Sequence, residues 1–279
     1  MRIIPILLYH SVSDDPSPAL ARYTVSPTLF REHASVLADQ GWRVLTIAEL
    51  DHRIALGRLD DEPTMALTFD DGFADTAEHA APILADYGFP ATLYVTTGCV
   101  GSPCEWLGPQ GRRPMASWSQ LRDLASSGWE IGAHSVSHPE LDVLPLAAAR
   151  QQIRDSRASL QERLGLPVDS FAYPHGYHST AVRREVIDAG FRTACAVKNA
   201  LSSERDDPFA RARLTVISTL SAEELGWMLG GGDTGEPPVA SVRERPRTTA
   251  WRCYRRLRQR TVLGARAVHG NRTRSGARR

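Results

Sequence analysis

The sequence has few cysteines and no long apolar run. Its 279 residues include four cysteines, too few and too scattered for a disulfide framework, which is typical of a reducing compartment. No apolar stretch approaches the roughly eighteen residues that cross a bilayer. The apolar start, residues 3–8, runs on without the small-residue cleavage site of a signal peptide, and we interpret it as a buried strand. We therefore expect a cytoplasmic protein.

Acidic residues are nearly absent from the end of the chain. Residues 237–279 contain thirteen arginines and one acid, Glu244, a net charge of +12, whereas the residues before them carry 20 basic and 31 acidic side chains. Glycine and proline are dense between these two parts, at 230–238, and break any regular element there. The composition predicts a globular domain over residues 1–232, followed by a linker and an arginine-rich tail over 233–279.

The tail combines aromatic and basic residues in the segment 251–260. This composition suits an anionic membrane surface, where each basic residue contributes about 1 kcal/mol of binding free energy. Nucleic acid is another polyanionic partner, and a disordered solubilising tail is the plainer alternative. We expect a peripheral contact with the inner face of a membrane rather than binding to nucleic acid.

Short apolar segments alternate with helical segments before residue 230. The expected strands are 3–9, 65–69, 91–96, 129–133, 170–173, 193–197 and 214–217. The expected helices are 28–40, 74–87, 119–127, 146–164, 179–189 and 222–229. This alternation is typical of an α/β protein whose largely parallel sheet is open or closed into a barrel. In a barrel, the chemistry gathers where strands end and loops begin.

The first chemical cluster is Thr68-Phe69-Asp70-Asp71-Gly72, at the end of an expected strand. Two adjacent carboxylates repel each other unless a cation or a proton separates them, and the glycine lets the backbone turn. Aspartate and glycine are also common in solvated turns, which is the simpler interpretation of this segment alone.

The second cluster is His134-Ser135-Val136-Ser137-His138, directly after another expected strand. Two imidazoles at this spacing lie on one side of a tight turn, and with a carboxylate they make a three-ligand metal site with an open position. Two surface histidines would give the same pattern. The pairing with an Asp-Asp strand end is what favours a site.

The third cluster is Phe171-Ala172-Tyr173-Pro174-His175-Gly176. The proline marks the end of a strand, and the amide of His175 after it is available to a ligand. Alone, this segment is equally typical of a strand terminator.

Together these segments resemble the polysaccharide deacetylase family, the NodB-homology or chitin deacetylase-like carbohydrate esterases of family 4. The first cluster is similar to the family's first motif at each residue, the second to its H-[ST]-x-x-H motif, and the third to a FAYPYG variant. The resemblance covers about residues 1–230. It implies a distorted (β/α) barrel of fewer than eight strands, a divalent metal, most simply Zn²⁺, and hydrolysis of N-acetyl groups on a sugar.

The resemblance also implies roles for individual residues. Asp71, His134 and His138 would bind the metal, and Asp70 would be the general base acting on water, whose pKa falls from 15.7 to about 7 in zinc hydrolases. The backbone N–H of His175 would stabilise the oxyanion. Substrate-binding positions in and near these motifs are Tyr173, Pro174 and His175, and Trp106 is an aromatic candidate for stacking on a sugar.

The sequence departs from the commonest family pattern at two positions. No histidine lies within 200–230, where the family usually has its general acid. We therefore assign the general acid to His10, in Tyr9-His10-Ser11-Val12. This position resembles that of the histidine in family members with rearranged motifs, which are similar to poly-N-acetylglucosamine deacetylases. The alternative for His10 is a core histidine. Ala172 replaces the arginine that orients the base, and Arg213 either substitutes for it from a neighbouring strand or forms a surface ion pair.

The function we expect is therefore metal-dependent removal of N-acetyl groups from an aminosugar in a polysaccharide, oligosaccharide or glycolipid. Two alternatives stay open at this point. One is a deformylase or other amide hydrolase acting on a lipid-linked aminosugar. The other is a carbohydrate-binding protein with a degenerate site.

Overall fold

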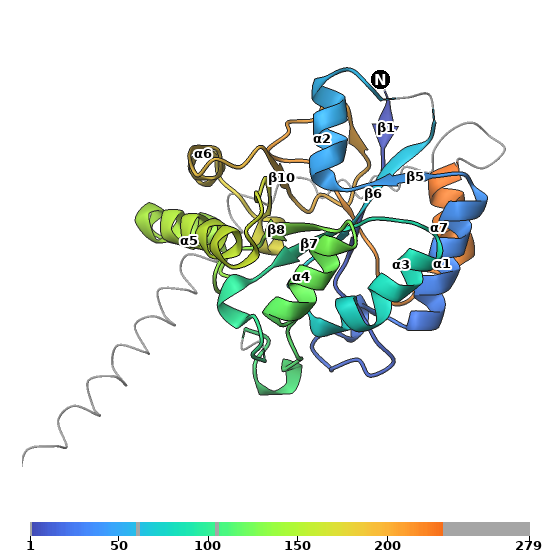
Figure 1. Ribbon diagram of the computed structural model, residues 1–279, viewed down its shortest axis with the longest axis horizontal. Helices are drawn as coiled ribbons and strands as arrows, with labels where there is room; N and C mark the ends of the chain where they lie inside the picture. Colours follow the sequence, from blue (N-terminus) through green and yellow to red (C-terminus); the bar gives the residue numbers. More distant parts are fainter. Residues whose placement is uncertain (1, 60–61, 104–105, 231–279) are drawn as a thin grey trace, which may run out of the picture.

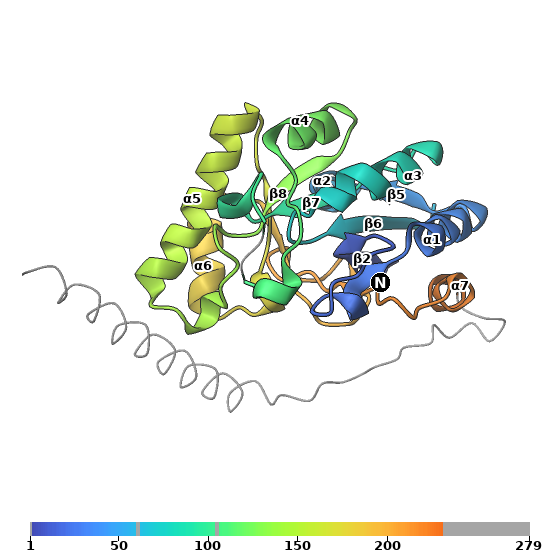
Figure 2. The same ribbon diagram turned by 90° about the horizontal axis from the view of Figure 1, so that it is seen from below.

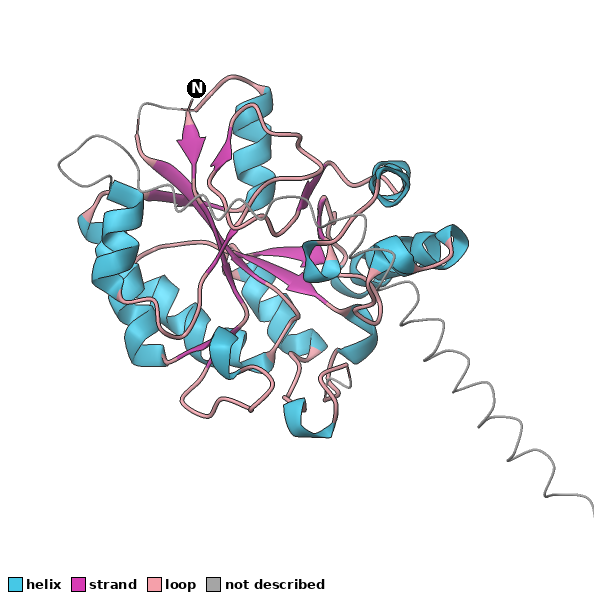
Figure 3. Ribbon diagram, turned by 180° about the vertical axis from the view of Figure 1, so that it is seen from behind, coloured by secondary structure: helices cyan, strands magenta, loops and turns pink. Residues whose placement is uncertain are grey.

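The computed structural model describes residues 2–59, 62–103 and 106–230. Strands occupy the centre of the molecule and helices surround them (Figure 1, Figure 3). None of the helices in this part of the chain combines the length and the apolar character that a bilayer span requires. The expected linker and arginine-rich tail, 233–279, lie outside the described residues, so their membrane contact stays a prediction.

A parallel sheet forms the centre. Its strands are β2 (Ile6–Tyr9), β5 (Arg43–Leu45), β6 (Thr64–Phe69), β7 (Thr92–Val95), β8 (Glu130–Ala133), β9 (Ser170–Ala172), β10 (Thr193–Cys195) and β12 (Leu214–Thr215). Seven of them follow the order β10-β9-β8-β7-β6-β2-β12, and β5 lies off this path, paired with β6. Two short pairs lie outside the sheet: β1 (Ile3–Ile4) with β11 (Ser202–Ser203), and β3 (Ser11–Val12) with β4 (Thr24–Val25).

The sheet curls back toward its first strand. Arg211 forms a parallel bridge with Cys195 of β10, and β12, three residues further on, pairs with β2. The segment 211–215 therefore connects the two ends of the seven-strand path. This confirms the expected distorted (β/α) barrel, in which seven strands follow the curled path. Strand β5 pairs with the first residues of β6, and β7 pairs with the last ones.

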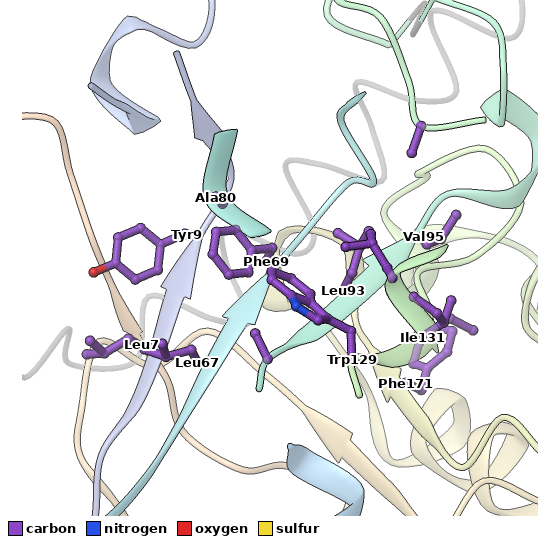
Figure 4. Close-up of a cluster of buried hydrophobic side chains, with 14 of the residues drawn as sticks. Leu7, Tyr9, Leu67, Phe69, Ala80, Leu93, Val95, Trp129, Ile131 and Phe171 are labelled. Atoms are coloured by element: carbon purple, nitrogen blue, oxygen red, sulfur yellow. The ribbon is translucent and has the colours of Figure 1, made fainter. Parts of the chain in front are cut away.

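Side chains alternate between the two faces of the strands, as the period of two requires. One set packs against the helices and includes Leu7, Tyr9, Leu67, Phe69, Leu93, Ile131 and Phe171 (Figure 4). The other set fills the barrel interior and includes Ile6, Ala66, Tyr94, Ala172 and Cys195. Because both faces are buried, the strands are nearly continuous apolar runs, as parallel sheets usually are.

The helices are α1 (Pro27–Asp39), α2 (Ile47–Ala55), α3 (Ala81–Asp86), α4 (Trp118–Ser126), α5 (Leu146–Leu164), α6 (Thr180–Asp188) and α7 (Ala222–Gly230). Hydroxyl side chains cap five of them: Ser26, Thr46, Ser117, Ser179 and Ser221 each accept a hydrogen bond from a first-turn backbone N–H. Helix α7 packs against α1, which places the last described residues beside the first helix (Figure 1, Figure 2).

Two parts of the fold differ from the sequence prediction. The helix expected over 74–87 is present without a break from 74 to 86, but its middle, η2 (Thr76–Ala80), is π-helical and leads into α3, where Pro82 has no N–H to donate to the preceding turn. The stretch containing β5 and α2 carried no predicted element, since a three-residue strand is too short to show a period.

Helix α2 covers the end of the barrel at which the parallel strands begin. The backbone N–H of Ile47 donates to Thr92 Oγ1 at 2.9 Å, and that of Ala48 donates to the Glu130 carboxylate at 2.8 Å. Thr92 and Glu130 are the first residues of β7 and β8. The residues of the three motifs lie at the other end, where the strands finish.

Candidate functional site

The three motifs meet at the carboxyl-terminal ends of neighbouring strands. Asp70 and Asp71 follow β6, His134 follows β8, and the short helix η6 (Pro174–Gly176) follows β9. His10 follows β2, which pairs with β6. The parallel register therefore brings together side chains that are far apart in the sequence.

Asp71, His134 and His138 form a compact buried group. Asp71 Oδ1 lies 3.1 Å from His138 Nε2 and 3.6 Å from His134 Nε2. One ligand atom from each residue lies within 4.8 Å of the other two. All three side chains are buried, so the group is shaped by the fold rather than by solvent-exposed rotamers.

The backbone of this site is strained. Asp71, Ser135, His138 and His175 have positive φ angles of 76°, 64°, 58° and 58°. They are four of the five non-glycine residues with positive φ in the described part of the chain. Such conformations cost about 1–3 kcal/mol each and persist where the surrounding structure holds them, most often at functional sites.

A backbone carbonyl sets the tautomer of His134. Its Nδ1 donates to the carbonyl oxygen of Ala172 at 2.7 Å, so Nε2 presents a lone pair toward Asp71. Burial lowers the pKa of His134 to about 4, against the opposing charges of Asp70 and Asp71. The imidazole is therefore neutral near pH 7, which is the form that binds a metal.

The donor set fits a divalent cation. Asp71 Oδ1 and His138 Nδ1 are buried polar atoms with no hydrogen-bond partner among the described residues, and such orphaned atoms are rare in protein interiors. A cation between the three residues would accept a lone pair from Asp71 Oδ1. One carboxylate and two imidazoles are the ligand set of many zinc hydrolases, which keep a fourth position open for water.

Asp70 faces a buried arginine, and its Oδ2 also lies 3.9 Å from His134 Nε2. Arg213 donates to both oxygens of Asp70, at 2.7 Å each, and its side chain has no exposed surface. Burial acts to raise the pKa of Asp70, but Arg213 together with His134 and His10 outweighs it, and the pKa is lowered. Of the two alternatives for Arg213, the structure therefore selects a contact within the site over a surface ion pair.

His10 lies at the same end of the barrel. A positive charge on it would help to lower the pKa of both Asp70 and Asp71, although burial acts in the opposite direction. Its ring packs against Tyr23 at a centroid distance of 5.1 Å. The site therefore has a titratable imidazole close to the paired carboxylates.

The third motif contributes a turn and one exposed ring. The His175 ring contacts His138 edge-to-face at 4.6 Å and is exposed. Tyr173 is fully buried, and its hydroxyl donates to the carbonyl of Phe209 at 3.0 Å. Pro174 is buried as well. A ring without exposed surface cannot stack on a sugar in this conformation, so the structure assigns the side chains of Tyr173 and Pro174 to packing.

Trp106 lies directly beside the candidate metal ligands. Its indole is stacked on the ring of His138, with centroids 4.8 Å apart and an interplanar angle of 19°. Phe73 lies behind it at 6.5 Å. This contact forms an aromatic wall on one side of the group, and the substrate contact of Trp106 stays a prediction.

Three site residues were not identified from the sequence. Thr68 accepts a hydrogen bond from Arg213 at 3.2 Å. Its position two residues before Asp70 puts it on the same face of the strand, which is the sequence signal that could have identified it. Tyr23 and Asp75 reach the site region through the β3–β4 pair and through Ser11, respectively. Nothing in the sequence pattern marks these contacts.

Comparison with known proteins identifies one matching family. Residues 58–194 match the family model described as polysaccharide deacetylase. This segment contains all three motifs.

The chain also resembles two curated proteins. It is 24% identical over 223 residues to the putative polysaccharide deacetylase YxkH of Bacillus subtilis (strain 168), a match that covers 80% of this chain and 75% of that protein. It is 26% identical over 133 residues to the poly-β-1,6-N-acetyl-D-glucosamine N-deacetylase of Escherichia coli (strain K12). The second match covers 46% of this chain and 20% of that protein.

A solved structure shows the same fold. The Streptococcus pyogenes deacetylase PplD in complex with acetate superposes with a TM-score of 0.73 at 23% identity, and the match covers 82% of this chain and 98% of that chain.

Proposed function

Because this chain carries a domain of the polysaccharide deacetylase family, we propose that it is a metal-dependent hydrolase that removes N-acetyl groups from an aminosugar in a glycan. One observation carries the proposal: Asp71, His134 and His138 form a buried donor group, and the separately held carboxylate of Asp70 lies beside it. A divalent cation, most simply Zn²⁺, would be held by the first three residues. When bound, it would supply Lewis acidity that polarises the acetamide and lowers the pKa of water.

Asp70 would take the proton from the attacking water. A general base must be ionised in the resting enzyme, and Arg213 keeps Asp70 ionised by lowering its pKa against the effect of burial. The two parallel hydrogen bonds from Arg213 also fix the plane of the carboxylate. Asp70 is thus oriented by Arg213 while the adjacent Asp71 faces the imidazoles.

Two further groups would complete the reaction. The amine leaves only when it is protonated, and His10, at the end of β2 next to the carboxylates, would supply that proton. The backbone N–H of His175 would donate to the acetamide oxygen as negative charge develops on it. Removing one such donor usually costs about 2.7–4 kcal/mol of transition-state stabilisation.

The substrate class follows from the relatives and from the aromatic wall. A curated relative is named for N-deacetylation of poly-β-1,6-N-acetyl-D-glucosamine. The indole of Trp106, stacked on His138, offers a face on which a sugar ring packs while its acetamido group reaches the donor group. An N-acetylglucosamine polymer or oligomer is therefore the first substrate to test.

The test is release of acetate from N-acetylglucosamine oligomers by the zinc-loaded protein. We expect release by the wild type and a loss of about 10²–10⁴-fold in Asp70→Asn, with the metal content unchanged. Asp207→Asn is the matched control, because Asp207 is also held by two hydrogen bonds from an arginine, Arg183, outside the site.

Two results would change the proposal. Release of formate or another acid instead of acetate would show a different amide hydrolase. Sugar binding without any hydrolysis would show a carbohydrate-binding protein. The cytoplasmic location and the attachment of the tail to a membrane are separate proposals, which a liposome-binding assay with and without residues 237–279 would test.

A further inference from the structure

The orientation of the His10 ring is not set by a hydrogen bond at Nδ1. That atom is buried and has no partner among the described residues. Catalytic histidines usually have one ring nitrogen held by a carbonyl or a carboxylate. Here the position of the ring must come from the backbone on either side of His10 and from the side chain packed against it.

The backbone around His10 is anchored on both sides by the chain that follows β6. Before His10, the carbonyl of Tyr9 accepts a hydrogen bond from the N–H of Asp70 at 3.0 Å. After it, the hydroxyl of Ser11 donates to Asp75 Oδ2 at 2.6 Å. His10 therefore lies between two anchors that are five residues apart, at Asp70 and Asp75.

Asp75 is a buried charge with a defined partner. Its side chain is 7% exposed, and Oδ2 also accepts from Arg113 Nη2 at 3.0 Å, whose side chain is 11% exposed. Arg113 donates through Nη1 to the carbonyl of Asp15. The loop from Ser11 to Asp15 is thus held near both ends by one Asp–Arg pair.

The same loop brings Tyr23 to His10. Strand β3, which begins at Ser11, pairs with β4, and the N–H of Ser13 donates to the carbonyl of Val25 at 3.0 Å. Tyr23 immediately precedes β4 and packs on the His10 ring. Holding Ser11 therefore also holds the aromatic contact of His10.

We propose that Asp75 is a positioning residue for His10: by binding Ser11, the residue after His10, it fixes the imidazole toward the paired carboxylates. This inference rests on the proposed function, in which His10 protonates the leaving amine. In the described part of the chain Asp75 binds Ser11 and Arg113, and it acts on His10 through the backbone of residues 10–12. Its removal should therefore slow turnover without removing the metal.

The experiment measures kcat for acetate release and zinc content in Asp75→Ala and Asp75→Asn. The alanine variant loses the acceptor, and we expect kcat to fall about 10- to 100-fold, part of the 10²–10⁴-fold that a general acid contributes. The asparagine variant keeps one oxygen at the position of Oδ2, so we expect it to restore kcat to within about fivefold of the wild type. Zinc should stay bound in both.

A double-mutant cycle distinguishes positioning from general destabilisation. In a His10→Ala background, Asp75→Ala should change kcat by less than about threefold, because residues that act as a unit are not additive. Glu185→Ala is the matched control: its carboxylate is also 7% exposed and paired with an arginine, Arg150, but it lies in α6. We expect the control to lower the melting temperature and leave kcat unchanged.

Each outcome decides a different point. Equal losses of kcat from Asp75→Ala in both backgrounds, or no loss in the wild-type background, would overturn the positioning role while deacetylation stands. An unchanged kcat in His10→Ala would also overturn the positioning role of Asp75. A wild type that releases no acetate contradicts the proposed function itself. If Asp75→Ala does not fold, Ser11→Ala removes the same anchor, and it should show the same non-additive pattern with a smaller loss.

Discussion

Asp70 and Arg213 are 143 residues apart in the sequence and meet through two parallel hydrogen bonds of 2.7 Å in the barrel interior. The guanidinium also donates to Thr68 Oγ1 and to the carbonyl of Ala196, so three elements hold it. The Asp70–Arg213 pair gives the two adjacent carboxylates different environments. Asp70 is neutralised by an arginine, and Asp71 is left facing two imidazoles.

Arg213→Met should raise the pKa of Asp70. In the wild type Arg213, together with His134 and His10, outweighs burial, and the pKa lies below its ordinary value of 3.8; removing Arg213 removes the largest of these charge contributions, so the pKa rises. A base with a raised pKa is protonated at low pH, so the acidic limb of the kcat/KM profile should move to higher pH. Removing one partner of a buried pair should also cost about 3–5 kcal/mol of unfolding free energy.

The pH–rate profile and chemical denaturation of the same samples check this prediction. Arg183→Met, which breaks the partly exposed pair with Asp207, is the matched variant and should leave the profile in place. An acidic limb that does not move in Arg213→Met would mean that Asp70 is not the titrating base.

Removal of divalent metal should abolish turnover and lower thermal stability. Asp71 Oδ1 and His138 Nδ1 have no other partner in the described chain, so the donor group is incomplete without a cation. A ligand present at about 100 times its dissociation constant stabilises the folded state by about 2.7 kcal/mol. Dialysis against a chelator, followed by zinc titration with calorimetry and acetate assays, measures both effects. Asp71→Asn should weaken zinc binding, and full activity of the metal-free protein would contradict the site.

Trp106→Ala should raise KM for N-acetylglucosamine oligomers more than it lowers kcat. The indole stacks on His138 with Phe73 behind it, so in the proposed site it would contribute chiefly to sugar binding. We expect an increase in KM of about tenfold, in line with the 1–3 kcal/mol that buried aromatic contacts contribute. Trp118→Ala is the control, because that tryptophan packs against Arg163 on the helix layer. A fall in kcat with KM unchanged would place Trp106 in a different role.

His33 should make stability depend on pH below about 6.5. This histidine is buried between β2 and the segment before α7: its ring contacts the Tyr9 hydroxyl at 3.1 Å and the Leu220 carbonyl at 2.9 Å. Burial lowers its pKa in the folded state, so the unfolded chain binds a proton first as the pH falls below 6.5. The stability contributed by the neutral form is therefore complete above 6.5 and is lost below it, by at most about 1.4 kcal/mol per pH unit.

Urea unfolding of wild type and His33→Gln between pH 7.5 and 5 measures this contribution. The variant should be less stable at pH 7.5, and its free energy of unfolding should fall less steeply as the pH decreases. Parallel curves for the two proteins would show that His33 does not titrate differently in the folded state.

The sequence predicted most of the sheet because its signals are local. The strand that ends at Phe69, just before Asp70, is a mostly apolar run, and the helix over 146–164 agrees with α5 at both ends. Features without a local signal were not predicted: β5 has only three residues, and the π-helical turn within the helix over 74–86 leaves no mark in the apolar period. Tyr173 was misjudged for a related reason, since a pattern does not show which way a ring points.

By itself, the order of residues determined which groups are available for chemistry. Asp70 and Asp71 are neighbours along the chain, and His134 and His138 share one turn, so each short motif already contains its own reactive pair. The tertiary structure decided how these pairs are used. Curling of the parallel sheet places Arg213 against one carboxylate and the histidines against the other, and it anchors His10 through Asp75. These relationships depend on strand register and on contacts across more than sixty residues, which no local pattern encodes.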